Sequence, residues 1–520
     1  MALPQILWAD DEIDLLRPHI LFLETKGYEV TSVTNGADAV EQVREGNYDV
    51  VLLDEQMPGM GGLEALSEIK DISPELPVVL VTKSEEENLM EEALGGQIND
   101  YLTKPVNPSQ ILLTCKRILE RTRLQSEKAS QNYLHSFREI SMALMNPLSH
   151  EAWIDLYLKL VHYDLSLDGD EGVRQVLEDQ YREANREFGR FIEDNYKGWI
   201  DRTQEPPGED RPMLSHEVID SHVIPEIGDT PVLFFVIDCM RYDQWVEFER
   251  LMYPLFSIEK NYHYSILPTA TPYSRNAIFS GLLPRDLERE YPTLWSEGEE
   301  DEHSRNRNEE AFLKDLLSRK RVNARIRYEK IVTTQRGRDF AQNVSDFTQA
   351  ELNAIVVNFV DILAHSRSDS AVLKEIAPDE RAYRALTRTW FEHSWLYQAF
   401  QTLAEKNCTI IITSDHGAVR SLHPTKVIGD RETSTALRYK YGRNLRCDDK
   451  HAIFVKSPLE YGLPSRGINT NYIIAKEDYY FVYPTNYNHY VNMYRDTMQH
   501  GGVTMEEVIL PIIKLVPRDV

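Results

Sequence analysis

Short apolar runs alternate with segments of helical periodicity in the first part of the chain. The runs cover residues 6–9, 28–33, 49–54, 77–82 and 100–105. Strands that alternate with helices form a parallel sheet, because each helix carries the chain back to the same edge of the sheet. The pattern therefore predicts a doubly wound parallel α/β domain over residues 1–122.

Helical periodicity without strands fills the middle of the chain, residues 123–215. The last helix of the first domain runs on toward Ile140, and further helical patterns cover residues 153–167, 172–180 and 181–199. Glycine and proline are scarce until Pro206-Pro207-Gly208, a composition typical of a linker. The pattern predicts a helical bundle followed by a linker.

A second α/β pattern occupies residues 216–520. Its strand-like runs cover residues 232–238, 354–361, 409–413 and 508–513. Apolar, β-branched runs of this length are typical of buried strands in a parallel sheet. Open α/β sheets bind their ligands at the carboxyl ends of such strands. We therefore expect the polar residues that follow these runs to carry the chemistry of this domain.

Length and charge limit the class of protein. A chain of 520 residues is too long for one hydrophobic core, which agrees with three segments. The formal net charge of -27, from 57 basic and 84 acidic residues, argues against broad binding to polyanions. The middle segment also lacks a short basic recognition helix, so no direct DNA binding is expected.

The sequence predicts a cytoplasmic protein without a membrane span. It contains no apolar run of about 18 residues, and its N-terminus lacks the basic and apolar regions of a signal peptide. The cysteines are far apart and match no disulfide or zinc framework: Cys115, Cys239, Cys408 and Cys447. A reducing cytoplasm is the simplest compartment for them.

Acidic residues gather at the strand ends of the first domain. Asp10 and Asp11 follow the first run, and Asp54 ends the third. Clustered carboxylates repel one another unless a cation lies between them, so the sequence implies a Mg²⁺ ion here. Thr82 and Lys104 end two other runs and would offer a hydroxyl and an ammonium group to an incoming phosphoryl group.

These positions make the first domain resemble the CheY-like receiver domain of two-component response regulators. The acidic pair, Asp54, Thr82 and the lysine before Pro105 agree with that domain in type and order. The resemblance implies that Asp54 accepts a phosphoryl group from a sensor histidine kinase. The switch residues that it implies are Thr82, Tyr101 and Lys104. The Mg²⁺ site that it implies is formed by Asp10, Asp11, Asp54 and the backbone carbonyl of Gln56.

Acids and histidines follow the strand-like runs of the C-terminal domain in the same way. They are Asp238, Asp361, His365, Asp415, His416 and His500. Each of them alone has an ordinary structural explanation, such as a helix cap or a buried histidine, but together they favour a common metal centre. Carboxylates and imidazoles suit two Zn²⁺ ions. A hydroxyl-rich loop at residues 269–274 also opens a helix, whose N-terminus favours phosphate.

These segments resemble the alkaline phosphatase superfamily, in particular its PglZ branch. The resemblance implies one zinc bound by Asp238, Thr271, Asp415 and His416, and another bound by Asp361, His365 and His500. It implies that Thr271 is the nucleophile, with Thr269 as the rival, and that Arg275 or Asn276 contacts a non-bridging phosphate oxygen. Three histidines compete with His500 as the last ligand: His423, His451 and His489. His500 is favoured by Gly501-Gly502 and by the strand that follows.

A receiver, a helical middle and a PglZ-type domain in one chain resemble response regulators linked to the type IX secretion system. That resemblance implies regulation of secretion genes with an alternative sigma factor as a partner. We expect phosphorylation of Asp54 to form a homodimer and to control a di-zinc phosphodiesterase that acts on nucleotide phosphodiesters. Whether phosphorylation raises or lowers the activity stays open.

The alternative class is a non-catalytic regulator. In that case the zinc-bound domain is a scaffold that binds a sigma factor or a nucleotide. The complete ligand set and the intact Thr271 favour catalysis. Replacing Thr271 by alanine separates the two classes, because a scaffold keeps signalling when the hydroxyl is lost.

Overall fold

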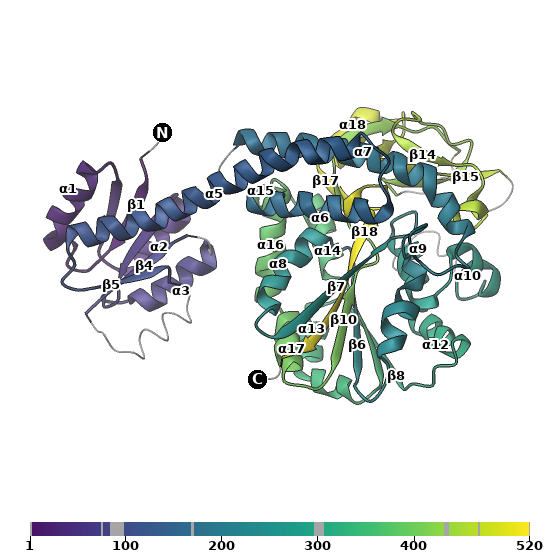
Figure 1. The fold of residues 1–520 in the computed structure, drawn as a ribbon, viewed down its shortest axis with the longest axis horizontal. Helices are drawn as coiled ribbons and strands as arrows, with labels where there is room; N and C mark the ends of the chain where they lie inside the picture. Colours follow the sequence, from purple (N-terminus) through teal and green to yellow (C-terminus); the bar gives the residue numbers. More distant parts are fainter. Residues whose placement is uncertain are drawn as a thin grey trace. The chain divides into compact units, whose positions relative to one another are not determined.

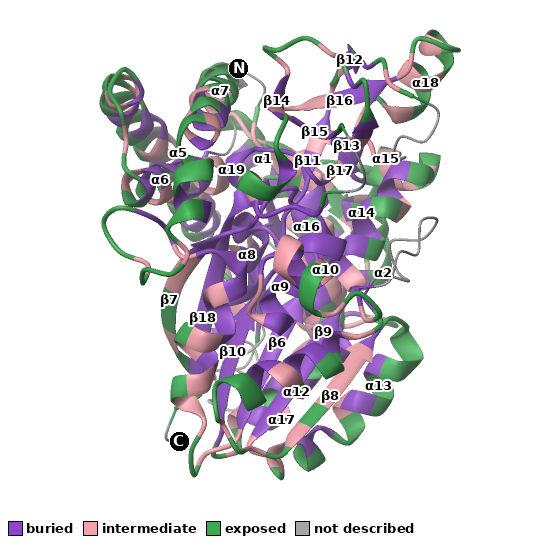
Figure 2. Cartoon of the chain, turned by 90° about the vertical axis from the view of Figure 1, so that its right-hand side faces the viewer, coloured by how far each residue is buried: buried purple, intermediate pink, exposed green. Residues whose placement is uncertain are grey.

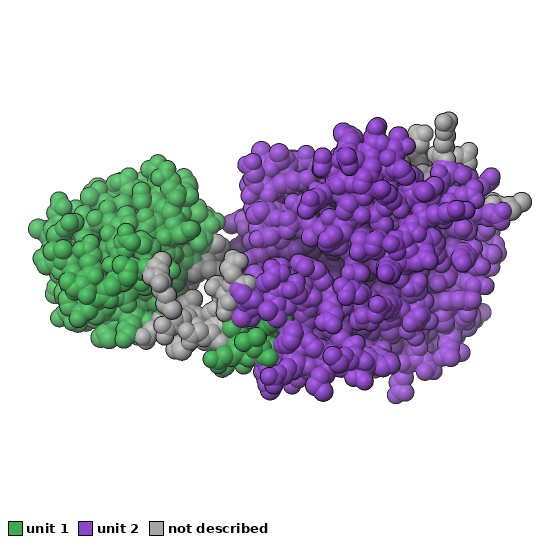
Figure 3. Space-filling view, turned by 90° about the horizontal axis from the view of Figure 1, so that it is seen from above, with its two compact units in different colours: residues 1–134, 166–170 green, residues 135–165, 171–520 purple. Residues whose placement is uncertain are grey.

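The computed structural model describes residues 3–73, 76–83, 98–167, 171–295, 306–430, 436–465 and 469–518. The chain forms two compact units (Figure 3). The N-terminal unit contains residues 1–134 and 166–170, and the C-terminal unit contains residues 135–165 and 171–520. Domain boundaries at 122 and 215 stay a prediction from the sequence.

A parallel five-stranded sheet forms the N-terminal unit, in the order β2-β1-β3-β4-β5. Its strands are β1 (Gln5–Ala9), β2 (Glu29–Val33), β3 (Val50–Asp54), β4 (Val78–Thr82) and β5 (Asp100–Thr103). The described helices beside it are α1 (Arg17–Thr25), α2 (Gly36–Glu45), α3 (Gly62–Ile72) and the start of α5 (Pro108–Leu144). Leu7 of β1 packs in a core with α2 and α3, and its neighbour Trp8 packs in another with α1 and α5. Helices on both faces confirm the predicted doubly wound fold.

Long helices follow this sheet. Helix α5 continues to Leu144, as its sequence pattern predicted, and is followed by α6 (His150–Ser166) and α7 (Glu171–Asp201). Helix α7 and all but the last residue of α6 belong to the C-terminal unit. The sequence pattern suggested two helices where the structure has α7 alone. That reading was wrong because no proline or glycine stands near Gln180, so helical hydrogen bonding continues through it.

A six-stranded sheet forms the centre of the C-terminal unit, in the order β7-β18-β10-β6-β9-β8 (Figure 1). Its strands are β6 (Val232–Ile237), β7 (Phe256–Tyr264), β8 (Ile326–Ile331), β9 (Leu352–Val357), β10 (Thr409–Thr413) and β18 (Ile509–Pro517). Strands β8, β9, β6 and β10 are parallel, whereas β18 pairs antiparallel with both β10 and β7. The chain just before β18 therefore lies at the same edge as the carboxyl ends of the parallel strands.

The central strands of this sheet are buried, and the edge strand β8 is partly exposed (Figure 2). Its helices include α8 (Tyr242–Met252), α9 (Thr271–Ser280), α14 (Phe359–Asp369), α16 (Glu380–Glu392) and α17 (Trp395–Ala404). The other described α-helices of this unit are α10 (Pro284–Glu290), α12 (Glu309–Arg319), α13 (Thr334–Gln342), α15 (Ala371–Ile376), α18 (Tyr487–Tyr494) and α19 (Met505–Val508). Every residue of α9 is buried, so its polar side chains need partners inside the protein.

Smaller sheets complete the C-terminal unit. One contains β13 (Tyr439–Arg443), β15 (Thr470–Ala475) and β14 (Ala452–Val455), and the pairs are β12 (His423–Lys426) with β16 (Tyr479–Val482) and β11 (Val419–Ser421) with β17 (Thr497–Gln499). The last pair fixes the chain directly before His500. Within the described ranges, no helix combines the length and apolar composition that a membrane crossing needs.

Candidate active site

Three groups of donor side chains occur in the described part of the chain, and two of them lie at the ends of strands of the two main sheets. Within each group, one carboxylate or imidazole atom of every member lies within 4.8 Å of the others. The groups are Asp10, Asp11 and Asp54; Asp238, Asp415 and His416; and Asp361, His365 and His500. The structure thus brings together the acids and histidines that the sequence singled out.

The first group belongs to the N-terminal unit, where Asp10 follows β1 and Asp54 ends β3. Lys104 Nζ lies 2.8 Å from Asp10 Oδ2 and 2.9 Å from Asp54 Oδ2. Burial raises the pKa of the Asp54 carboxyl; Lys104 lowers it and the charge of Asp10 raises it. Three carboxylates face one ammonium group, so net negative charge remains for a divalent cation. Oxygen donors of this kind fit Mg²⁺.

The predicted switch residues surround this group. Thr82 ends β4, and its hydroxyl donates a hydrogen bond to the carboxylate of Glu55, the residue after Asp54. Tyr101 lies on β5 with 41% of its surface exposed, and Gln56 is exposed in the loop after β3. Sequence reasoning missed Glu55, which engages the hydroxyl that would have to turn toward a phosphoryl group.

The second group lies in the C-terminal unit, where Asp238 follows β6 and Asp415 and His416 follow β10. All three are at most 1% exposed. Burial raises the pKa of the Asp415 carboxyl, and the charge of Asp238 raises it further. Among the described residues, Asp415 Oδ2 accepts no hydrogen bond. A buried carboxylate pair with such an oxygen fits a divalent cation, and the imidazole beside it suits zinc.

The third group combines a helix and a loop. Asp361 and His365 lie one turn apart on α14, and His500 follows β17; the Nε2 atoms of the two histidines lie 3.4 Å and 3.9 Å from Asp361 Oδ1. The sequence reading placed Asp361 at a strand end. That reading was wrong, because β9 ends at Val357 and α14 begins at Phe359. The pair meets because residues four apart share one face of a helix.

The second and third groups are neighbours. The rings of His416 and His500 stack with centroids 4.2 Å apart. Burial alone would raise the pKa of the Asp361 carboxyl, but His365 and the charges of His500 and His416 outweigh it and hold the pKa below its usual range. Two adjacent carboxylate–imidazole groups fit a pair of zinc ions.

Thr271 is the hydroxyl residue that the structure brings to these donors. It is the first residue of α9, with Pro272 in the first turn as predicted. Its Oγ1 lies 2.8 Å from His416 Nε2 and 3.4 Å from Asp238 Oδ1. The hydroxyl of Thr269 donates a hydrogen bond to the Gly502 carbonyl oxygen at 2.8 Å.

Arg275 and Asn276 are both buried within α9. The Arg275 guanidinium forms ion pairs with Asp238 and Glu309 and lies 4.0 Å from Asp415. Asn276 Nδ2 donates to a backbone carbonyl of the same helix. Arg275 thus balances buried carboxylates, and a contact of either residue with a phosphate oxygen stays a prediction. Sequence reasoning missed Glu309, which begins α12 and lies 34 residues after Arg275 in the chain.

The alternative histidines lie elsewhere in the C-terminal unit. His423 Nδ1 lies 2.7 Å from Asp478, His451 stacks on Tyr479, and His489 belongs to α18. In the part of the chain that the structure describes, none of the three joins a metal-donor group. His500 is the histidine that the structure places in the third group.

Sequence reasoning also missed residues that hold the acids in place. Asn358 Nδ2 donates to Asp238 Oδ2 at 2.7 Å. Cys239 has a left-handed φ of 67°, which is uncommon for a residue other than glycine, and its N–H donates to Asp415 Oδ1 at 3.3 Å. Asn358 directly follows an apolar run, and that position is the signal that could have identified it.

Gly417 directly follows His416, in a place where a side chain would have no room. A Cβ atom at this position would lie 2.0 Å from the carbonyl oxygen of Glu506. Gly417 is not among the glycines with positive φ. The residue is therefore explained by close packing of the segment after His416 against the segment before β18.

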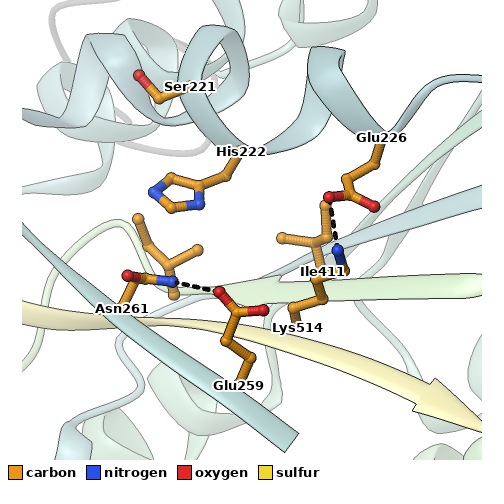
Figure 4. Close-up of a pocket in the computed structure, with 8 residues that line it drawn as sticks. Ser221, His222, Glu226, Glu259, Asn261, Ile411 and Lys514 are labelled. Carbon is orange, nitrogen blue, oxygen red and sulfur yellow. Dashed lines mark hydrogen bonds and ion pairs between the residues drawn. The ribbon is translucent and has the colours of Figure 1, made fainter.

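Two hollows of the C-terminal unit differ in their relation to these groups. An open groove of about 440 Å³ adjoins the third group; its lining is Asp361, Ile362, His365, Ser366, Asp369 and Ser370. A cavity of about 60 Å³ lies between the helix Ile219–Val223 and strands β7, β10 and β18 (Figure 4). Its lining contains none of the donor side chains. Of these two hollows, the groove is the one whose lining includes donor side chains.

Family comparisons agree with this geometry. The model of the BREX system PglZ alkaline phosphatase-like domain matches residues 218–515, more than half of the chain. The chain therefore belongs to the PglZ family of alkaline phosphatase-like domains. The response regulator receiver domain model matches residues 6–116, and the PorX response regulator linker domain model matches residues 123–200. Receiver, linker and PglZ domain in this order make a PorX-type architecture.

Individual relatives match about a quarter of the chain. The transcriptional regulatory protein SrrA of Staphylococcus aureus is 31% identical over 132 residues, which are 25% of this chain and 54% of SrrA. The chain thus spans about half the length of the curated relatives it matches. A receiver domain structure from Clostridium thermocellum is 29% identical, covering 24% of this chain and 98% of its own, with a TM-score of 0.23. A CheY-like receiver from Methanospirillum hungatei is 27% identical, covering 23% and 95%, with a TM-score of 0.22.

Proposed function

We propose that this response regulator uses its receiver domain to control a di-zinc phosphodiesterase in which Thr271 is the covalent nucleophile. The observation that carries the proposal is the position of the Thr271 hydroxyl, 2.8 Å from His416 Nε2 and 3.4 Å from Asp238 Oδ1. An activated hydroxyl at a helix N-terminus can attack a phosphoryl group while the helix end holds it.

The two C-terminal donor groups are the proposed zinc ligands. The first zinc would be bound by Asp238, Thr271, Asp415 and His416, and the second by Asp361, His365 and His500. When bound, a pair of zinc ions lowers the pKa of the attacking hydroxyl and stabilises charge on the leaving oxygen.

The chain's own groups then define a double displacement. Thr271 Oγ1 forms a bond to phosphorus while the bond from phosphorus to the leaving oxygen breaks, and the hydroxyl proton departs with that oxygen as an alcohol. The positive end of the α9 dipole favours the phosphoryl charge. A water molecule next attacks phosphorus, the bond to Oγ1 breaks and the remaining phosphomonoester leaves. A proton of that water returns to Thr271 Oγ1. The groove lined by Asp361 and Ser366 would receive the leaving group, and nucleotide phosphodiesters are the expected substrate class.

The N-terminal group supports control by phosphorylation. We expect Asp54 to accept a phosphoryl group from a sensor histidine kinase, with Mg²⁺ bound by Asp10, Asp11, Asp54 and the Gln56 carbonyl. Lys104 already lies within 3 Å of Asp10 and Asp54 and would contact the new phosphoryl oxygens. The Thr82 hydroxyl would exchange Glu55 for the phosphoryl group, and Tyr101 would turn inward.

Phosphorylation is proposed to change both the oligomeric state of the protein and its regulatory role. The phosphorylated receiver would form a homodimer, which sedimentation with a phosphoryl mimic tests directly; an unchanged mass would count against it. Regulation of type IX secretion genes with an alternative sigma factor is the expected biological role. A cytoplasmic location stays a prediction.

The test is hydrolysis of bis-p-nitrophenyl phosphate and p-nitrophenyl phosphate by zinc-loaded protein. Wild type should prefer the diester, and Thr271→Ala should lose about a thousandfold or more of that rate because the nucleophile is gone. Thr271→Ser keeps a hydroxyl and should keep part of the rate. Diester cleavage by Thr271→Ala at the wild-type rate would contradict the proposal. No cleavage by zinc-loaded wild type would favour the zinc-bound scaffold.

A further inference from the structure

Helix α7, part of the segment matched by the PorX linker model, reaches the loops of the active site. Two of its polar side chains, Asn185 and Tyr196, are buried, with 8% and 2% exposure. Their positions are about three helical turns apart, so both side chains lie on the same face of α7. This face is turned into the C-terminal unit.

An aromatic cluster fixes α7 against the end of β7. Tyr264, the last residue of β7, packs against Phe188 and Trp199 of α7 with ring centroids 6.1 Å and 5.6 Å apart. The Tyr264 hydroxyl also donates to the backbone carbonyl of His150 at the start of α6. Aromatic packing of this kind leaves the helix little freedom to shift relative to β7.

Tyr196 contacts the loop that leads to the nucleophile. Its hydroxyl oxygen accepts a hydrogen bond from the backbone N–H of Leu267 at 2.9 Å. Leu267 lies between the end of β7 and Thr271, in a segment that has left the sheet and has not yet entered α9. The hydrogen bond therefore fixes the path of the loop four residues before Thr271.

Asn185 contacts the segment that follows His500. Its Oδ1 accepts from the backbone N–H of Met505 at 2.8 Å, and its Nδ2 donates to the Glu506 carboxylate at 3.0 Å. Both partners are the first residues of α19. One amide side chain thus holds the start of this short helix by both of its polar atoms.

The segment 500–507 is itself bonded to the other loops. Gly417 N–H donates to the Glu507 carbonyl oxygen at 3.3 Å, and within the segment Gly502 N–H donates to the Glu507 carboxylate at 2.8 Å. Thr269 donates to the Gly502 carbonyl oxygen. A shift of α19 would therefore displace His500 and the loop after His416.

We propose that α7 is a positioning element of the active site, with Tyr196 setting the Thr271 loop and Asn185 setting the His500 segment. The inference rests on the proposed function. Since the two residues hold different loops, their loss has different signatures. Loss of the Tyr196 hydroxyl slows turnover with both zinc ions in place, and loss of the Asn185 amide weakens the zinc site that contains His500.

The experiment compares full-length Tyr196→Phe, Asn185→Ala and Asn185→Gln with wild type. Asn195→Ala is the matched control, because Asn195 is an exposed asparagine of the same helix that bonds only to the helix backbone among the described residues. The readouts are zinc per chain after gel filtration, zinc affinity, the visible spectrum of the cobalt-substituted protein, and kcat and KM for bis-p-nitrophenyl phosphate.

We expect Asn195→Ala to match wild type in every readout. Tyr196→Phe should keep both metals and an unchanged KM while kcat falls about tenfold. Asn185→Ala should bind the second zinc about tenfold more weakly and alter the cobalt spectrum. Asn185→Gln keeps both amide atoms and should recover part of that affinity.

Wild-type values for both Tyr196→Phe and Asn185→Ala would overturn the inference, as would equal effects of Asn185→Ala and Asn195→Ala. Tyr196→Phe removes one oxygen atom, so it tests the proposal even if Asn185→Ala fails to fold. Zinc binding by wild type without cleavage would refute the proposed function, while the metal readouts would still decide the role of Asn185. A wild type that binds no zinc would refute both.

Discussion

Acidic side chains gather beside strand ends in both sheets of this chain, yet their surroundings differ. In the N-terminal unit, Asp11 is exposed and Lys104 shares the site with Asp54. In the C-terminal unit, Asp238 and Asp415 are at most 1% exposed. Carboxylates at strand ends are common to both, so the strand ends alone do not decide the chemistry. Asp10 and Asp54 are also buried, at 0% and 3% exposure, so the difference lies in the exposed Asp11 and the ammonium group of Lys104. The C-terminal acids are instead paired with the buried guanidinium of Arg275 and lie beside imidazoles.

Removal of zinc should distinguish the two sites most clearly, and its effect on diester hydrolysis is the largest effect that we expect. A chelator selective for zinc should abolish diester hydrolysis, because the buried carboxylates would lose the cations that balance them. Labelling of Asp54 by acetyl phosphate with Mg²⁺ should survive the same treatment. Hydrolysis that persists after zinc is shown to be gone would break the comparison.

The second largest effect is expected on stability, from replacing a closely packed glycine beside each site. A Cβ at Gly417 would lie 2.0 Å from the Glu506 carbonyl oxygen, and one at Gly62 would lie 2.2 Å from the Asp54 carbonyl oxygen. Because backbone must move in both cases, Gly417→Ala and Gly62→Ala should each destabilise their own unit by about 3 kcal/mol. Chemical unfolding measures this effect.

The matched control is Gly198→Ala in α7, where a Cβ would meet no atom within 4 Å. An alanine there should stabilise the protein by about 0.5–1 kcal/mol, since glycine is the poorer helix residue. Equal effects of Gly417→Ala and Gly198→Ala would show that close packing at the site is not the reason for the glycine.

Removal of the ammonium group tests the N-terminal site alone. Lys104→Ala should lower the rate of Asp54 labelling by acetyl phosphate about tenfold, because one charge-assisted contact to the incoming phosphoryl group is lost. The basal diester rate of the same protein should stay at the wild-type value. A labelling rate equal to wild type would mean that Lys104 serves only to balance Asp10 and Asp54.

Acid should weaken the C-terminal unit slightly. Burial lowers the pKa of His263 to about 4 from an ordinary value of 6.5. The unfolded chain binds this proton near pH 6.5 and the folded chain does not, so stability is full above pH 6.5 and falls as the pH drops toward 4. His263 alone should account for a loss of about 1 kcal/mol between pH 7.5 and 5.5.

Unfolding of the C-terminal unit at several pH values measures this loss. His263→Gln keeps a polar atom near Thr413, which His263 Nε2 contacts at 3.1 Å, and removes the titration. The variant should therefore show a smaller loss over the same interval. A slope equal to that of wild type would assign the acid sensitivity to other groups.

Much of both sites could be predicted from the sequence because short apolar runs define strand ends. That rule located Asp54, Asp238 and Asp415, and the structure confirms the strands that precede them. It misplaced Asp361, because the periodicity of residues 354–361 does not show where β9 stops and α14 starts. Helical spacing nevertheless brought Asp361 and His365 together.

The supporting contacts could not be predicted, because they depend on how distant segments pack. Asn358 reaches Asp238 from the residue between β9 and α14, and Glu309 reaches Arg275 from another helix. The explanation of Gly417 likewise requires the position of Glu506, far along the chain. The residue types of the site are visible in the sequence, while the contacts that orient them appear only in the fold.

The central claim is that Thr271 forms a covalent intermediate, and the stereochemical course at phosphorus tests it most directly. A chiral phosphorothioate diester would be hydrolysed by zinc-loaded protein in isotopically labelled water. Two in-line displacements, first by Thr271 and then by water, predict net retention of configuration. Net inversion would show a single attack by water and would contradict the role of Thr271.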